Sequence, residues 1–273
     1  MTSQSDKVAA FHKLHEEGCF VIPNPWDVGS AVLLESMGFK ALATTSAGFA
    51  WSIARPDQGV GRVEMLEHLG EIARAVEIPV SADFEGGYAD DPDGVAESVK
   101  LAAATGLAGL SIEDSTRGAD EPLYPIDLAV ERIRAARSAI DESGTGILLT
   151  GRSEGFVAGR PDLEETIRRL QAYAEAGADC VYAPFIDTPE QISAVVAAVA
   201  PKPVNLLVYK PFITLGAAAE LGVRRISLGG SLARVAQAAF IAAAQEIADD
   251  GTFTRLGDLP NNAAVNASFT DRA

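Results

Sequence analysis

Short apolar runs alternate with helical patterns along most of the chain. Eight runs of strand length are apolar and end in polar residues: 19–23, 41–45, 78–82, 107–112, 146–150, 179–183, 203–208 and 225–228. Between them, apolar positions recur with helical spacing, often among alanines: 30–37, 62–76, 92–104, 127–142, 162–176, 189–199 and 214–221. Because the strand-like runs are continuously apolar rather than alternating, we expect parallel strands that are buried on both faces.

Eight β–α units in series most simply close into a (β/α)8 TIM barrel, so the predicted fold class is α/β. A chain of 273 residues matches one such barrel, and two smaller domains are the competing division. An open, doubly wound sheet is the alternative architecture, but no GxGxxG motif follows the first predicted strand. We therefore predict one barrel domain that spans residues 1–273.

The C-terminal part, residues 231–273, differs from the repeating units. Residues 231–248 form an alanine-rich helical pattern without an obvious charged face, and a tail runs on to residue 273. A helix this apolar is usually buried against another subunit, although it must also serve as the last helix of the barrel. We predict an oligomerisation helix and tail here.

The net charge of the chain is strongly negative, at −16, which argues against nucleic acids and anionic membranes as partners. A small anionic substrate is still allowed, because a metal ion or an arginine can reverse the field inside a cleft. The first residues are polar, no apolar run reaches the length of a membrane span, and Cys19 and Cys180 have no cysteine or histidine cluster nearby. We expect a soluble cytoplasmic protein.

Two acidic clusters follow buried strands of the predicted barrel. Asp83 and Glu85 come after the third strand, and Glu113 and Asp114 come after the fourth. Carboxylates at the ends of buried strands are costly to desolvate unless a cation pairs with them. Oxygen ligands of this kind favour Mg²⁺, with Mn²⁺ as the other candidate.

The ends of other strands add groups that could bind a small anion. The small residues Ser46, Ala47 and Gly48 form a predicted turn whose backbone N–H groups a carboxylate could approach closely. Arg152 could hold a carboxylate in a bidentate fork, since strand ends of a barrel converge on one site. The structural alternative is that the acids cap helices and that Arg152 pairs with Glu154 or Glu113. No histidine ends a strand, which argues against a zinc site and against histidine acid–base catalysis.

Several of these motifs resemble the isocitrate lyase/phosphoenolpyruvate mutase superfamily of Mg²⁺-dependent barrels. The resemblance runs from Asn24-Pro-Trp-Asp27 to Leu228-Gly-Gly-Ser231 and is most specific at residues 46–48, 57, 81–88, 112–114 and 152. It implies that Asp57, Asp83 and Glu113 hold Mg²⁺, directly or through water. It further implies that residues 46–48 and Arg152 bind the carboxylate end of the substrate, and that Asn205 makes further oxyanion contacts. The family also tends to form tetramers that exchange the final helix, which here is the 231–248 segment.

The chain departs from its named relatives at two places. Ser81 stands where the family has the first Asp of an Asp-x-Asp pair, and Glu85 is the residue that could compensate. The segment 115–124 has neither the Cys and His of the isocitrate-type lyases nor the Lys and Asn of the phosphonomutases. Arg117 and Tyr88 are then the nearest candidates for proton handling, and a water on the metal is the alternative base.

The leading hypothesis is a Mg²⁺-dependent lyase or hydrolase. It would cleave a C–C bond in a small 2-oxo or 2-hydroxy (di)carboxylate through a metal-stabilised enolate, with Arg152 assisting. The alternatives are phosphorus–carbon bond chemistry on a phosphonate and a non-catalytic protein that binds a 2-oxo acid. The expected partners are the small-molecule substrate and other copies of the chain, as a dimer or tetramer.

Overall fold

The computed structural model describes residues 2–116, 118, 120–257 and 259–270. Eight parallel strands form a nearly closed barrel in the order β1-β8-β7-β6-β5-β4-β3-β2. The strands are β1 (Phe20–Ile22), β2 (Leu42–Ala43), β3 (Val80–Asp83), β4 (Gly109–Glu113), β5 (Leu148–Arg152), β6 (Cys180–Tyr182), β7 (Val204–Leu207) and β8 (Arg225–Ser227). Ala43 N donates to Pro23 O (3.0 Å) across the seam between β1 and β2. The predicted α/β barrel is confirmed, and each strand lies where an apolar run predicted it.

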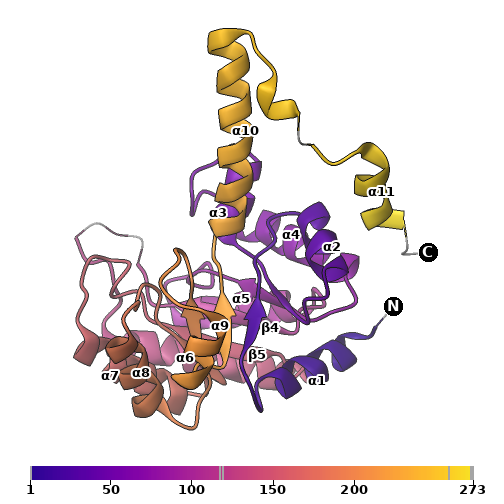
Figure 1. Cartoon of the computed structure of the whole chain (residues 1–273). Helices are drawn as coiled ribbons and strands as arrows, with labels where there is room; N and C mark the ends of the chain where they lie inside the picture. The colour runs from indigo at the N-terminus through magenta and orange to yellow at the C-terminus, as the bar shows by residue number, and fades with distance from the viewer. Residues whose placement is uncertain (1, 117, 119, 258, 271–273) are drawn as a thin grey trace.

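The described residues also form helices, most of which surround the barrel (Figure 1). They are α1 (Gln4–Leu14), α2 (Val28–Ser36), α3 (Ser46–Ser52), α4 (Arg62–Ala75), α5 (Pro92–Ala103), α6 (Ile126–Ser143), α7 (Leu163–Glu175), α8 (Pro189–Val199), α9 (Leu215–Glu220), α10 (Ser231–Asp250) and α11 (Asn262–Thr270), with a 3-10 turn at Thr254–Leu256. Polar caps explain several starts: Asp27 and Thr188 each close a capping box, and Asp91 caps α5 ahead of Pro92. Helices α3 and α11 were not predicted.

Helix α1 covers the end of the barrel where the strands begin. Phe11 is fully buried there, and its ring lies so close to Gly109 at the start of β4 that a side chain at Gly109 would collide with it. His12 Nε2 contacts the carbonyl of Gly146 ahead of β5 (2.8 Å). The polar residues at the strand C-termini lie at the opposite end of the barrel from α1.

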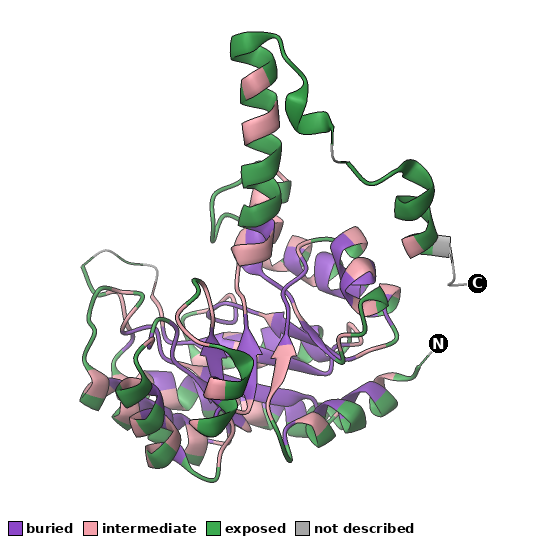
Figure 2. Cartoon of the chain, viewed as in Figure 1, coloured by how far each residue is buried: buried purple, intermediate pink, exposed green. Residues whose placement is uncertain are grey.

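Helix α10 leaves the barrel as a projecting arm (Figure 1), and its surface is almost wholly exposed (Figure 2). Ala233 is its one buried residue among those described. Val235, Phe240 and Ile241 are 66%, 73% and 59% exposed, which is unusual for large apolar side chains. The predicted long helix is confirmed, and its role between subunits stays a prediction. No helix in the described part of the chain is long and apolar enough to cross a membrane.

Candidate active site

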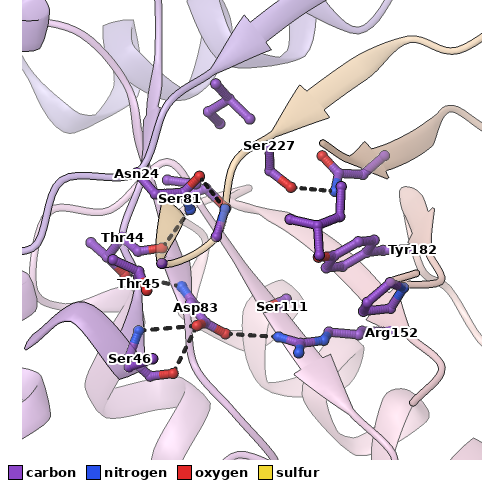
Figure 3. Close-up of a pocket in the computed structure, with 18 of the residues that line it drawn as sticks. Asn24, Thr44, Thr45, Ser46, Ser81, Asp83, Ser111, Arg152, Tyr182 and Ser227 are labelled. Atoms are coloured by element: carbon purple, nitrogen blue, oxygen red, sulfur yellow. Dashed lines mark hydrogen bonds and ion pairs between the residues drawn. The ribbon is translucent and has the colours of Figure 1, made fainter. Parts of the chain in front are cut away.

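A cavity of about 240 Å³ lies at the C-terminal ends of the strands. Figure 3 shows polar side chains from β3, β5, β6 and β8 and from the β2–α3 connection pointing into it. Its polar lining residues are Asn24, Thr44, Thr45, Ser46, Asp57, Ser81, Asp83, Ser111, Arg152, Tyr182, Asn205, Arg225 and Ser227. Among the sequence-predicted site residues, Ser46, Ala47, Asp57, Ser81, Asp83, Arg152 and Asn205 line this cavity, whereas Gly48, Glu85, Tyr88 and Glu113 do not.

Asp83, the last residue of β3, is held in a fixed orientation. One carboxylate oxygen, Oδ2, accepts from the backbone N–H of Ser46 (3.0 Å) and from its hydroxyl (2.8 Å), and the other, Oδ1, accepts from Arg152 (3.1 Å). These bonds connect the first residue of α3 to the end of β5 across the cavity (Figure 3). They therefore fix the position of a carboxylate that is still partly exposed to the cavity.

The segment 46–48 is the first turn of helix α3 rather than the isolated turn expected. Thr45 caps this helix by accepting from Gly48 N (3.2 Å), and Ser46 N is bonded to Asp83. A side chain at Gly48 would collide with Thr45 and Trp26, so this glycine is required for packing. Two of the three N–H groups expected to meet a substrate carboxylate thus have partners within the protein.

Arg152 ends β5 and lies among three carboxylates. Its guanidinium contacts Glu154 (2.5 Å), Asp83 (3.1 Å) and Glu113 (3.3 Å), and it also lies over the ring of Tyr182 at 5.2 Å. Three carboxylates and one guanidinium leave an excess of negative charge in a largely buried cluster. Burial raises the pKa of Glu113 well above its usual value, and Arg152 offsets this only in part.

The donors of this cluster fit a hard divalent cation in chemistry and in charge, since they are oxygens with surplus negative charge. In the described part of the chain, however, no three His, Cys, Asp or Glu side chains converge closely enough to hold an ion between them. Asp57 lines the cavity from an exposed loop, and Ser81 offers a hydroxyl where a carboxylate is usual in the family that the chain resembles. We therefore expect the free protein to bind Mg²⁺ weakly.

Glu85 and Tyr88 lie in the loop after β3 and do not line the cavity. Both have left-handed backbone conformations (φ 49° and 59°), and the Tyr88 hydroxyl donates to Glu85 Oε1 (3.2 Å). Burial raises the pKa of Tyr88, and Asp83 and Glu113 raise it further. Tyr88 therefore stays protonated and cannot serve as a base, which opposes the proton-handling role considered for it. Arg117, the other candidate, lies outside the described residues.

Asp114 belongs to the framework rather than to the cavity. Its carboxylate accepts from Tyr173 (2.5 Å), Arg169 (3.0 Å) and the backbone N–H of Glu154 (2.7 Å). These contacts connect the end of β4 to the end of β5 and to α7, and so they hold Glu113 and Arg152 in place.

The floor of the cavity holds a residue that sequence reasoning missed, Arg225 at the start of β8. Its Nε donates to Asn205 Oδ1 (2.8 Å), and Asn205 Nδ2 in turn donates to Ser227 Oγ (2.9 Å). The sequence signal that could have revealed it is a charged residue in an otherwise apolar strand. Arg225 comes two positions before Ser227, which places both side chains on the same face of the strand.

Comparisons with known proteins agree with this geometry. The family model described as phosphoenolpyruvate phosphomutase matches residues 11–248. A candidate lyase/mutase from Burkholderia cenocepacia J2315 has a solved structure with 46% identity and a TM-score of 0.95, covering 97% of each chain. The solved structure of oxaloacetate acetylhydrolase with the product oxalate shows 26% identity and a TM-score of 0.87, covering 98% of this chain and 95% of that one. Oxaloacetate decarboxylase of Pseudomonas putida (strain GB-1) is 31% identical over 187 residues, which is 66% of this chain and 63% of that protein.

Proposed function

The chain belongs to the phosphoenolpyruvate mutase family of the isocitrate lyase superfamily and is an enzyme of that C–C lyase or hydrolase type, and we propose that it acts with Mg²⁺ on a small 2-oxo or 2-hydroxy dicarboxylate. The C–C bond next to the oxygen-bearing carbon would break through an enolate. The observation that carries this proposal is the cluster of Asp83, Glu113 and Arg152 at one end of a small cavity. The names of two relatives, a decarboxylase and an acetylhydrolase of oxaloacetate, support a substrate of this size.

Each residue of the cluster would have a separate role in the reaction. Asp57, Asp83 and Glu113 would hold Mg²⁺, with Mn²⁺ as a substitute, and the bound ion would supply a Lewis acid for charge that develops on a substrate oxygen. Ser46 fixes the orientation of Asp83 through two hydrogen bonds, so the carboxylate need not reorganise when substrate binds. Arg152 brings a positive charge to the same side of the cavity and would stabilise the enolate oxygen.

Glu113 must lose its proton before it can hold Mg²⁺. Burial raises its pKa well above the usual value, so we expect metal binding at this carboxylate to weaken as the pH falls. It contacts Arg152, which lines the cavity, and Arg152 itself is too basic to give up a proton.

Turnover of oxaloacetate with and without divalent metal tests the proposal. We expect product formation with Mg²⁺ and its loss in excess chelator, and we expect Asp83→Asn to reduce turnover at least about 100-fold. Asp127→Asn, at an exposed position of α6, is the matched control and should leave turnover unchanged. Equal turnover of wild type in excess chelator would contradict the metal dependence.

Phosphonate chemistry is the second candidate, because the matching family model is described as a phosphomutase. Phosphorus NMR of the protein with phosphonopyruvate decides between the two. A new phosphorus signal would favour this candidate, and an unchanged spectrum beside active C–C cleavage would exclude it. The non-catalytic alternative is not favoured, because the named relatives are enzymes.

We also propose that a second copy of the chain covers α10. The exposed Val235, Phe240 and Ile241 lie on a helix that projects from the barrel (Figure 2). Light scattering should give a dimer or tetramer for the wild type and smaller species for Phe240→Asp. Val63→Asp, at an equally exposed apolar position of α4, is the control and should keep the wild-type mass. A monomeric wild type would contradict this proposal.

A further inference from the structure

Arg225 is a buried cation without an anionic partner. Its side chain lies inside the barrel, where the residue is 5% exposed, and it forms part of the cavity surface. Its nitrogens contact Asn205 Oδ1 (2.8 Å), Thr150 Oγ1 (3.1 Å) and His15 Nε2 (3.3 Å). In the part of the chain that the structure describes, no carboxylate forms an ion pair with it.

The contacts of Arg225 satisfy hydrogen bonds but do not neutralise its charge. Asn205 and Thr150 are neutral side chains. Burial, with a smaller contribution from Arg225, lowers the pKa of His15 to about 3, so the imidazole is uncharged near neutral pH. Its Nδ1 lies 2.8 Å from the carbonyl of Phe11, where an N–H is required, which leaves Nε2 to accept from Arg225.

A buried charge of this kind is rare, because removing an ion from water costs several kcal/mol unless an opposite charge meets it. A guanidinium has five N–H donors, and three contacts engage only some of them. Arg225 lines the cavity, so its unbalanced positive charge borders the space that a ligand would fill. An anion in the cavity would therefore be attracted to it.

We infer that Arg225 binds one carboxylate of a short dicarboxylate substrate at the floor of the cavity, while the reacting end lies beside Asp83 and Arg152. This inference deepens the proposed function and rests on it. Arg225 is then the residue that selects a dicarboxylate over the corresponding monocarboxylate.

The arrangement of the barrel supports a ligand that reaches from Arg225 to Arg152. These two arginines mark two levels of the cavity, with Arg225 at the floor and Arg152 nearer the C-terminal ends of the strands. Arg225 contacts Thr150, and Arg152 follows Thr150 by two residues on the same strand. Two residues along a strand are about 6.6 Å apart, which is the scale of a four-carbon dicarboxylate. Ser81 and Asp83 on β3 repeat the same step on another wall of the cavity.

The surroundings of Arg152 and Arg225 also differ in charge, in the direction that this assignment requires. Arg152 already contacts three carboxylates, so a substrate carboxylate there would meet surplus negative charge. Arg225 lies among hydroxyl and amide groups, including Ser227, whose hydroxyl accepts from Asn205. The floor is thus the better place for the second carboxylate.

Calorimetry with L-malate and L-lactate tests the assignment, because these 2-hydroxy acids differ only by the second carboxylate. In the full-length protein with Mg²⁺, we expect malate to bind at least about 30-fold more tightly than lactate. Arg225→Met should abolish this preference by weakening malate alone. Arg225→Lys keeps a positive charge without the fork and should leave malate about 10-fold weaker, with lactate unchanged.

Arg224→Met is the matched control. Arg224 precedes Arg225 and contacts the carbonyl of Gly18 outside the cavity, so its loss should leave the malate-to-lactate ratio as in the wild type. A purely structural role for Arg225 would change the melting temperature of its variants but not this ratio. If Arg225→Met does not fold, an unchanged ratio in Arg225→Lys overturns the inference.

The outcomes separate this inference from the proposed function. Malate binding that depends on Arg225, without turnover of oxaloacetate, would uphold the floor site and reject the lyase proposal. Turnover of oxaloacetate with an unchanged ratio in the Arg225 variants would uphold the lyase proposal and overturn the floor site.

Discussion

The cavity contains two arginines with opposite surroundings. Arg152, at the C-terminal end of β5, contacts Glu154, Asp83 and Glu113 within 3.3 Å. Arg225, at the start of β8, contacts an amide, a hydroxyl and a neutral imidazole. The surroundings of Arg152 are therefore short of positive charge, whereas those of Arg225 have an excess of it. An arginine that lines a cavity therefore indicates anion binding only when its charge is not already balanced.

Removing Arg152 should have the largest effect. Arg152→Met leaves two buried carboxylates, Glu113 and Glu154, and the partly exposed Asp83 without their cation, so we expect the free energy of unfolding to fall by about 3–5 kcal/mol. Turnover should fall by about 10³-fold, because the charge that faces the enolate is lost. Denaturant titration and initial rates measure the two effects. Arg134→Met, at an exposed pair with Glu131, is the control and should change neither. A stable Arg152→Met protein would show that the carboxylates are already neutral.

Adding a carboxylate near Asp83 should increase the difference in charge between the surroundings of Arg152 and those of Arg225. Ser81→Asp places an acid on the cavity wall two residues before Asp83, and we expect Mn²⁺ to bind about 10-fold more tightly, since affinity rises with ligand charge. Paramagnetic resonance with Mn²⁺ measures the binding. Ser81→Asn has nearly the same shape without the charge and should bind Mn²⁺ as the wild type does. Equal affinity in the two variants would mean that position 81 does not face the metal.

The neutral imidazole beside Arg225 predicts a pH dependence of stability. The pKa of His15 is about 3 in the folded protein and 6.5 in its ordinary state, so unfolding takes up a proton between these values. The contribution of His15 is fully present above pH 6.5 and is lost as the pH falls, by about 1 kcal/mol at pH 5.5. His15→Gln should remove this part of the slope between pH 7.5 and 5.5 in chemical denaturation. The same slope in the variant would show that His15 is not buried in its neutral form.

Removing Arg225 should have the smallest effect on stability. Arg225→Met abolishes an unbalanced buried charge but leaves Asn205 and Thr150 with fewer hydrogen bonds, so the free energy of unfolding should change by less than about 1 kcal/mol. Denaturant titration beside Arg152→Met gives the comparison directly. A fall in the free energy of unfolding as large as that of Arg152→Met would contradict the difference in charge balance between the two arginines.

The strands of the barrel could be predicted because each requires only a local signal. Continuous apolar runs, helix-ending glycines and capping residues can be recognised in the sequence. Thr188 and Asp91 are examples, since they cap the helices that follow them. Helix α3 was missed because it has only seven residues and contains Gly48, which disfavours a helix. It forms because Thr45 caps it and because Trp26 and Ala233 pack against the bare backbone at Gly48.

The amino-acid sequence alone predicts the barrel, the acidic strand ends and the family, since periodicity and motif spacing are properties of the chain. It also indicated that Asp83 and Arg152 share a site, because strand ends of a barrel meet. The balance of charges in the cavity could be read only from the three-dimensional arrangement of the side chains. Electrostatic energy depends on distance and burial, and these place Arg152 among carboxylates and Arg225 among neutral groups.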